Sequence, residues 1–344
     1  MPEPRRAFAS ALDAYSRAAR DALTAYVSRG EPARFLYEPI RRCTLGPGKS
    51  LRPALCLAAC EAFGGSREEA MASAVAVELL HAAFLIHDDI EDGSRRRRGR
   101  AALHVELGTA IALNAGDALA VLAQRPLLDN VSRLGSRMAR SVLTEFQVAM
   151  ERTVEGQAVE LGWRHDQVVD LTPNDYLDMV LHKTCAYSTI LPLRVGALIG
   201  SWGEADLDAI ARFGFVLGAA FQVRDDVLDL VSTDASYGKN VLGDIWEGKR
   251  TLALIHLLRV ASSEDRTTVM AFLARPPDDR SGDGARQILS LMDRYGSIEF
   301  ASGYASRIAR EAMAGVDDAF AGCPPSPALA FLRGVVPFMV ERVA

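Results

Sequence analysis

The feature that most constrains the fold is a pair of long apolar segments, each ending in a cluster of acidic residues. The first segment, residues 71–86, is apolar on nearly every side when drawn as a helix, which is typical of a helix buried in a large helical protein. Asp88, Asp89 and Asp92 follow it directly. At these spacings a helix projects the carboxylates from neighbouring turns of one face, where they repel one another unless a cation lies among them.

The second cluster repeats the spacing of the first. Asp225, Asp226 and Asp229 follow an apolar run that begins at Leu207, and the clusters lie 225 − 88 = 137 residues apart. They therefore belong to separate helices that can face each other across a cavity. One such cluster would be interpreted as a solvated helix end, but two favour a shared metal site. Carboxylates suit Mg²⁺, which keeps several waters and completes its coordination with substrate phosphates.

The rest of the chain indicates one all-helical domain. No segment shows the alternating, β-branched pattern of a strand at useful length, and no Gly/Ser/Pro-rich linker divides the 344 residues. We therefore predict a single all-helical domain over residues 1–344. Helices are expected over residues 6–29, from a start within residues 49–53, and over 71–92, 108–122, 140–162 and 207–230. A further helix begins with Thr172 as its cap and Pro173 in its first position, and it ends near residues 182–185.

Composition excludes several function classes. A net charge of −5, with no interleaving of aromatic and basic residues, argues against nucleic acid as a partner. The five cysteines are scattered without zinc spacing, and the first 20 residues lack the apolar core of a signal peptide. The run 71–86 is too short to span a bilayer and contains Glu78 and His81. We predict a cytoplasmic protein without stable membrane insertion.

Basic residues accompany the acidic clusters. Lys49 and Arg52 stand at the start of a helix, where free amides and the dipole already favour an anion, although an ordinary capped start with solvated bases has the same pattern. Four arginines, residues 95–98, follow the first cluster. On their own they would indicate a solvated or nucleic-acid-facing patch. Beside a metal–carboxylate cluster, guanidinium groups that clamp phosphate oxygens are the better interpretation.

Taken in order, these motifs resemble those of the trans-isoprenyl diphosphate synthases, also called polyprenyl synthetases, over roughly residues 48–256. His81 falls at a histidine of the family's isopentenyl diphosphate site. The matching motifs are Gly48-Lys49-x-x-Arg52-Pro53, Asp88-Asp89-x-x-Asp92, Arg97-Arg98-Gly99, Lys183-Thr184, Phe221-Gln222, Asp225-Asp226-x-x-Asp229, Gly238-Lys239 and Asp244-Ile245-x-Glu247-Gly248-Lys249-Arg250-Thr251.

The resemblance implies an isoprenoid synthase fold, with antiparallel helices around a deep central cavity, and a homodimer. It implies a prenyltransferase that condenses isopentenyl diphosphate with an allylic diphosphate, using three Mg²⁺ ions with bound diphosphate, or Mn²⁺ in their place. The resemblance implies that the metal ligands are Asp88, Asp89, Asp92, Asp225 and Asp229, and that Asp226 and Lys183 join these aspartates in catalysis. It implies that isopentenyl diphosphate is bound by Lys49, Arg52, His81 and Arg98, and the allylic diphosphate by Arg97, Lys183 and Lys239. Substrate is also bound by Thr184, Gln222 and Lys249.

Product length is predicted from two residues before the first cluster. In the resembling family, aromatic residues four and five positions before the first aspartate close the pocket at farnesyl length, and a small residue at the fifth opens it. Here Phe84 and Ala83 occupy these positions. We therefore predict geranylgeranyl diphosphate as the product, with farnesyl diphosphate as the alternative. In another interpretation Ala83 only packs against a neighbouring helix and a different helix supplies the floor.

Two departures from the family pattern concern the substrate loops. Ala101-Ala102 replace the usual Pro-Thr after the arginine pair, and the chain ends Arg342-Val343-Ala344 without a basic tail. Other functions compatible with the fold are a terpene cyclase or a non-catalytic subunit of a heteromeric synthase. Cyclases usually lose the second aspartate motif and the isopentenyl site, and non-catalytic subunits lose aspartates. Neither loss is seen in this chain.

Overall fold

The computed structural model describes residues 3–27, 30–46, 48, 50–231 and 242–340 of the chain. Within these ranges the prediction of an all-helical fold is confirmed, because the strands among them are two residues long. Lys49 and Lys239, both predicted to bind substrate, lie outside the described residues.

In chain order the elements are α1 (Glu3–Tyr26), η1 (Ala33–Tyr37), α2 (Glu38–Thr44), α3 (Leu51–Ala62), α4 (Arg67–Glu91), β1 (Arg96–Arg97), β2 (Arg100–Ala101), α5 (Leu103–Leu107), α6 (Thr109–Leu122), α7 (Gln124–His165), α8 (Pro173–Val180), η2 (Leu181–Ile190), α9 (Leu191–Gly200), α10 (Leu207–Val231), α11 (Gly243–Glu247), α12 (Leu252–Val260), α13 (Ser263–Leu273), η4 (Pro277–Asp279), α14 (Gly282–Arg294), α15 (Ser297–Ala319) and α16 (Pro327–Val340).

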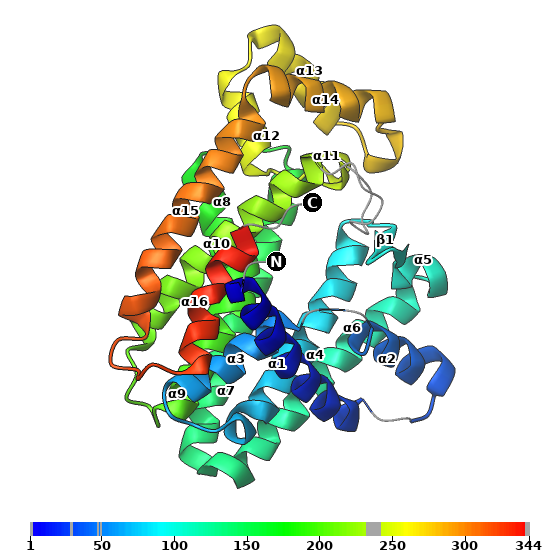
Figure 1. The fold of residues 1–344 in the computed structure, drawn as a ribbon. Helices are drawn as coiled ribbons and strands as arrows, with labels where there is room; N and C mark the ends of the chain where they lie inside the picture. Colours follow the sequence, from blue (N-terminus) through cyan, green and yellow to red (C-terminus); the bar gives the residue numbers. More distant parts are fainter. Residues whose placement is uncertain (1–2, 28–29, 47, 49, 232–241, 341–344) are drawn as a thin grey trace.

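Helix α4 occupies the centre of the fold. It begins with a capping box in which the Ser66 side chain accepts a hydrogen bond from the Glu69 amide and the Glu69 side chain accepts one from the Ser66 amide. It packs against α1, α3, α6, α7 and α9, which bury most of its apolar surface (Figure 1). Within the described residues, α4 is the one helix long and apolar enough to cross a membrane, yet 72% of that apolar window is buried inside the fold.

The other helices surround this centre. Figure 1 shows α15 along one side of the molecule, α13 and α14 at the top, and α2 and α5 on the opposite side. Helices α1 and α16 lie side by side, and the rings of Phe8 and Phe331 stack between them with centroids 4.8 Å apart. The buried apolar residues form one contiguous cluster that extends from Phe8 to Met339. That core fixes the ends of α4 and α10, where the two acidic clusters lie.

Two helix boundaries differ most from the predictions. Helix α7 begins at Gln124 rather than near residue 140, and Gly135, at φ 78°, makes a kink inside it. The predicted helix end at residues 182–185 is wrong, since α8 continues through the π-helix η2 directly into α9. The capped start of α8 is confirmed, because Thr172 and Asp175 form a capping box. A π-helix has no sequence signature, and the polar residues 182–184 therefore resembled a helix end.

A short hairpin follows the first acidic cluster. Strands β1 and β2 are antiparallel, with Arg97 opposite Arg100. Arg98 and Gly99 form the connecting turn with φ values of 51° and 78°. Two consecutive positive φ values are typical of the tight turns that join two antiparallel strands. The hairpin returns Arg97 to the acidic end of α4.

Candidate active site

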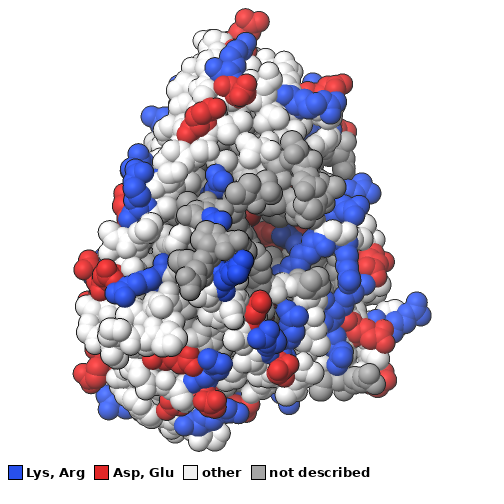
Figure 2. Space-filling model, viewed as in Figure 1, with Lys and Arg blue, Asp and Glu red and all other residues white. Residues whose placement is uncertain are grey.

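The two acidic clusters meet at one cavity of about 260 Å³. Asp88 lines it from α4, and Asp225 and Asp226 line it from α10. On the face drawn in Figure 2, Lys and Arg side chains gather beside a recess in which acidic side chains are visible. Predicted site residues that line the cavity are Arg52, His81, Phe84, Asp88, Arg97, Lys183, Thr184, Gln222, Asp225, Asp226 and Lys249.

Cations hold the first two carboxylates of the first cluster. Arg97 donates from Nε to Asp89 at 2.8 Å and from Nη2 to Asp88 at 3.2 Å. Burial raises the pKa of Asp89, although Arg97 opposes this effect. Asp88 lines the cavity, whereas the Asp89 side chain is only 7% exposed and faces the smaller space beneath the hairpin. Asp88 is thus the member of this pair that an incoming ligand can reach.

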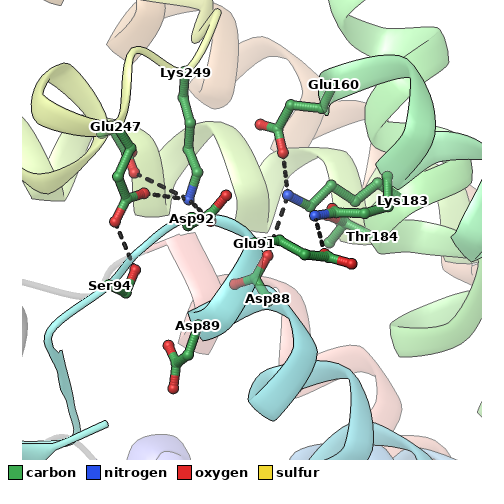
Figure 3. A network of polar contacts seen from close by, with 12 residues as sticks. Asp88, Asp89, Glu91, Asp92, Ser94, Glu160, Lys183, Thr184, Glu247 and Lys249 are labelled. Carbon is green, nitrogen blue, oxygen red and sulfur yellow. Dashed lines mark hydrogen bonds and ion pairs between the residues drawn. The ribbon is translucent and has the colours of Figure 1, made fainter. Parts of the chain in front are cut away.

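Lys183 connects the first cluster to α7. Its ammonium group pairs with Glu160 and lies 3.3 Å from Asp88 (Figure 3). Burial alone would lower the pKa of Lys183, but Glu160 and Asp88 outweigh it and raise the pKa, so the lysine stays charged. The close approach of the two helices depends on Gly156, where a Cβ would lie 2.2 Å from the Lys183 backbone nitrogen. Glu160 follows one turn later on α7.

Asp92 has a different environment from Asp88. Its side chain has 0% exposure, and it pairs with Arg164 at 2.6 Å and with Lys249 at 2.7 Å. Lys249 also lies 2.7 Å from Glu247, which accepts a hydrogen bond from Ser94 at 2.6 Å (Figure 3). This ion network ties the end of α4 to the segment after α11. Asp92 does not line the cavity, and its predicted role as a metal ligand stays a prediction.

In the second cluster, neutral hydrogen-bond donors hold Asp226. Asp226 accepts hydrogen bonds from Tyr176 Oη and Gln222 Nε2, each at 2.7 Å. Burial, with Asp244 adding to it, raises the pKa of Asp226 to about 7 despite these two donors. Asp229 is buried, accepts a hydrogen bond from the Asp244 amide at 3.1 Å, and is not among the residues that line the cavity. Asp225 is therefore the member of this cluster that faces the cavity without being fully buried.

Two of the residues predicted to bind isopentenyl diphosphate, Arg52 and His81, lie together on the cavity wall. Arg52, in the first turn of α3, donates from Nη1 to His81 Nε2 at 3.1 Å. Burial, followed by the charge of Arg52, lowers the pKa of His81 well below its ordinary value. The guanidinium of Arg98 lies beside Gly48 rather than on the cavity wall, since a Cβ on that glycine would meet Arg98 Nη1 at 3.2 Å. The half-buried Glu78 accepts a hydrogen bond from Ser50 at 3.3 Å close by.

The two residues predicted to set product length are placed differently. The Phe84 ring lines the cavity and contacts the ring of Tyr187 edge-to-face at 5.1 Å. Ala83 is 1% exposed and is not part of the cavity wall. This placement agrees with the alternative in which Ala83 packs inside the helical core.

Sequence reasoning missed several residues of the site. A lone buried lysine requires a carboxylate partner, and that requirement was a signal for Glu160, which stands on the helix predicted over residues 140–162. Tyr176, Tyr187 and Ser94 carried no such signal, because tyrosine and serine are common on helices and in loops. Their roles become visible only through contacts between segments far apart in the sequence.

The fold and cavity define an all-helical enzyme with an acidic and basic lining suited to a diphosphate. The chain matches the family model described as polyprenyl synthetase over residues 33–292. A short chain isoprenyl diphosphate synthase from Methanothermobacter thermautotrophicus is 33% identical over 336 residues, covering 96% of this chain and 97% of the relative. The chain therefore belongs to the polyprenyl synthetase family and is a trans-prenyl diphosphate synthase.

Solved structures agree with this assignment. Geranylgeranyl pyrophosphate synthetase from Pyrococcus horikoshii superimposes with a TM-score of 0.84 at 30% identity, covering 98% of this chain and 99% of that one. Geranylgeranyl pyrophosphate synthase from Corynebacterium glutamicum, solved with isoprenyl diphosphate and magnesium, has a TM-score of 0.86 at 26% identity, with 96% and 99% coverage. These similarities extend over nearly the whole chain and confirm the predicted fold.

Proposed function

We propose that this protein is a Mg²⁺-dependent synthase that condenses isopentenyl diphosphate with an allylic diphosphate to make geranylgeranyl diphosphate. The observation that carries the proposal is the single cavity lined by Asp88 and Asp225, one from each acidic cluster, together with Arg97 and Lys183. The proposal that the product is geranylgeranyl diphosphate is supported by homologues named geranylgeranyl diphosphate synthase, such as that of Sulfolobus acidocaldarius at 31% identity.

The donor set fits the proposed metal. Within the described ranges no group of three His, Cys, Asp or Glu side chains is close enough to hold an ion by itself. Mg²⁺ commonly takes only one or two carboxylates and obtains its other ligands from water and substrate phosphates, so Asp88 and Asp225 on facing walls suit it. Bound there, the ions would stabilise negative charge on the diphosphate that leaves. Mn²⁺ has compatible ligand preferences, and three ions per bound diphosphate remain our expectation.

The protein's own cations prepare the site for ionisation of the allylic substrate. Arg97 and Lys183 are held at Asp88 before substrate enters, and they are available to the oxygens of a diphosphate that approaches the same carboxylate. Charge developing on that diphosphate is stabilised by these fixed cations. The double bond of isopentenyl diphosphate, held on the side of Arg52 and His81, then attacks the allylic cation. Proton loss to the departed diphosphate yields the longer allylic product.

Incubation of the purified protein with isopentenyl diphosphate and each allylic starter, with Mg²⁺ or with EDTA, tests this function. We expect condensation with Mg²⁺ and geranylgeranyl diphosphate as the main product by mass spectrometry. Activity retained in EDTA would contradict the metal dependence. Farnesyl diphosphate as the main product would contradict the assigned length and agree with Phe84 closing the cavity.

Two substitutions separate the interpretations of product length. If the residue five positions before Asp88 limits the pocket, Ala83→Phe shortens the product toward farnesyl diphosphate. If Phe84 alone forms the wall, Phe84→Ala lengthens the product and Ala83→Phe leaves it unchanged. Product sizing by mass spectrometry distinguishes these outcomes, with the fold of each variant checked by circular dichroism.

We also propose a homodimer that pairs through α6 and α7. These helices carry large apolar side chains that are strongly exposed in the single chain, including Val121 at 69% and Leu128 at 68%. Val154 of α7 lines the cavity and is itself 61% exposed, so a second copy on this face would cover that part of the cavity wall. Light scattering at micromolar concentration should give a dimer mass, and Val121→Asp with Leu128→Asp should give a monomer.

A cytoplasmic location remains a prediction from the sequence.

A further inference from the structure

Tyr187 touches three residues of the site that lie on other helices. Its hydroxyl lies 3.3 Å from His81 Nδ1, and its ring packs 5.2 Å from the guanidinium carbon of Arg52. The edge-to-face contact with Phe84 completes the set. Tyr187 is 8% exposed, lines the main cavity, and is carried by η2 together with Lys183 and Thr184. It therefore joins the predicted isopentenyl end of the cavity to the aromatic wall.

The hydrogen bonds around His81 have a defined direction. The Arg52 guanidinium can only donate, so His81 Nε2 must accept from it. Burial and the charge of Arg52 both lower the pKa of His81, which keeps the imidazole neutral. A neutral imidazole that accepts at Nε2 carries its proton at Nδ1, and that N–H therefore donates to the Tyr187 oxygen. The order of donation is Arg52 to His81 to Tyr187.

These two hydrogen bonds fix the His81 imidazole at both of its nitrogen atoms. Without the Tyr187 oxygen, Nδ1–H would lose its buried acceptor, and His81 could rotate away from Arg52. The ring of Tyr187 makes a separate contribution, since it supports the guanidinium through a cation–π contact and Phe84 through an aromatic contact. The hydroxyl and the ring thus act on different neighbours and can be tested separately.

We propose that Tyr187 is a positioning residue whose hydroxyl orients His81 and Arg52 for isopentenyl diphosphate and whose ring holds Phe84 in the cavity wall. This inference rests on the proposed function, because it assigns the substrate whose binding the hydroxyl controls. It predicts that one side chain influences both the affinity for isopentenyl diphosphate and the length of the product, through separable atoms.

The first test is Tyr187→Phe, which removes the hydroxyl and keeps the ring. We expect the KM for isopentenyl diphosphate to rise about fivefold, the order of one hydrogen bond's net contribution, with the KM for the allylic diphosphate and the product length unchanged. Tyr15→Phe is the matched control, because Tyr15 is also buried and donates its hydroxyl to Glu61 far from the cavity. The control should change neither KM.

The second test asks whether the hydroxyl acts through His81. In a His81→Leu background the Tyr187→Phe change should have no further effect on the KM for isopentenyl diphosphate, because residues in one hydrogen-bond chain are not additive. Tyr187→Leu, which also removes the ring, should lengthen the product by releasing Phe84.

Three results would overturn the proposal. They are a Tyr187→Phe enzyme identical to wild type, equal rises in both KM values accompanied by a lower melting temperature, or full additivity with His81→Leu. Wild-type protein that consumes no isopentenyl diphosphate would overturn the proposed function and this proposal with it. An active wild type with an unaffected Tyr187→Phe variant would overturn this proposal alone.

Discussion

The first acidic cluster and Asp226 of the second lie in the same sequence pattern, but the protein compensates their charge differently. In the first cluster, Asp88, Asp89 and Asp92 are paired with arginine and lysine side chains from other segments. In the second, Asp226 is held by a tyrosine and an amide, and burial raises its pKa to about 7. Repeated motifs therefore do not imply repeated electrostatics, because partners from distant segments decide the charge state.

Position within each helix explains part of the difference. The first cluster ends α4 and is followed at once by the arginine hairpin, which returns its cations to the carboxylates. The second cluster lies inside α10, which continues past Asp229 to Val231. Gln222 reaches Asp226 because the two residues are four apart on one face.

The largest effect on stability is expected from Asp92→Ala. The substitution leaves Arg164 and Lys249 without the carboxylate that they share, and removing one partner of a buried ion pair costs about 3–5 kcal/mol. Urea unfolding should show a loss of this order. An exposed ion pair provides the control, and Asp317→Ala, which frees Arg333, should cost less than about 1 kcal/mol. Equal losses would mean that the first cluster is not held by its cations.

Each acidic cluster has one carboxylate that faces the cavity, and removing either of them should slow catalysis to a similar degree. We expect Asp88→Ala and Asp225→Ala each to lower kcat by about 10²–10³, the range for loss of one electrostatic contact directed at the transition state. Steady-state assays with Mg²⁺ measure this effect, and circular dichroism confirms the fold. A large loss for one variant and none for the other would show that the clusters do not share one site.

The pH dependence of stability should distinguish the clusters in the metal-free protein. Because the folded pKa of Asp226 is raised from 3.8 to about 7, the folded state favours its protonated form. The resulting stabilisation is fully present below pH 3.8 and is lost as the pH rises through about 7. In urea with EDTA, the free energy of unfolding should fall over this window by on the order of 4 kcal/mol relative to Asp226→Asn, since each unit of pKa shift corresponds to about 1.4 kcal/mol. A constant difference between the two proteins would contradict the shift.

The smallest effect concerns the hydrogen bond that ties the first cluster to the α11 segment. Ser94→Ala removes the donor to Glu247 and should cost about 1–2 kcal/mol, as for one bond to a charged group. Ser141→Ala on the exposed face of α7 is the control and should change stability by less than about 0.5 kcal/mol. Thermal unfolding of the two variants side by side measures the difference.

The sequence was sufficient to predict what depends on local pattern. Apolar runs placed α4 and α10, and the Thr172 cap placed the start of α8. The sequence was insufficient where the structure depends on contacts between distant segments. Lys183 was recognised as a site residue, but its partner Glu160 stands 23 residues away on another helix. Asp92 was grouped with Asp88 on one helix face, yet contacts with Arg164 and Lys249 separate their environments.

The π-helix η2 has a consequence for how this chain can be aligned with others. Its hydrogen bonds close over one more residue than those of an α-helix, so ten residues, Leu181–Ile190, occupy a path that tighter winding would fill with fewer. A relative that is α-helical here can keep both flanking helices in place with a shorter segment. The correct alignment would then contain a gap inside a continuous helix. An ungapped alignment would assign Lys183 and Tyr187 to counterparts that point in other directions.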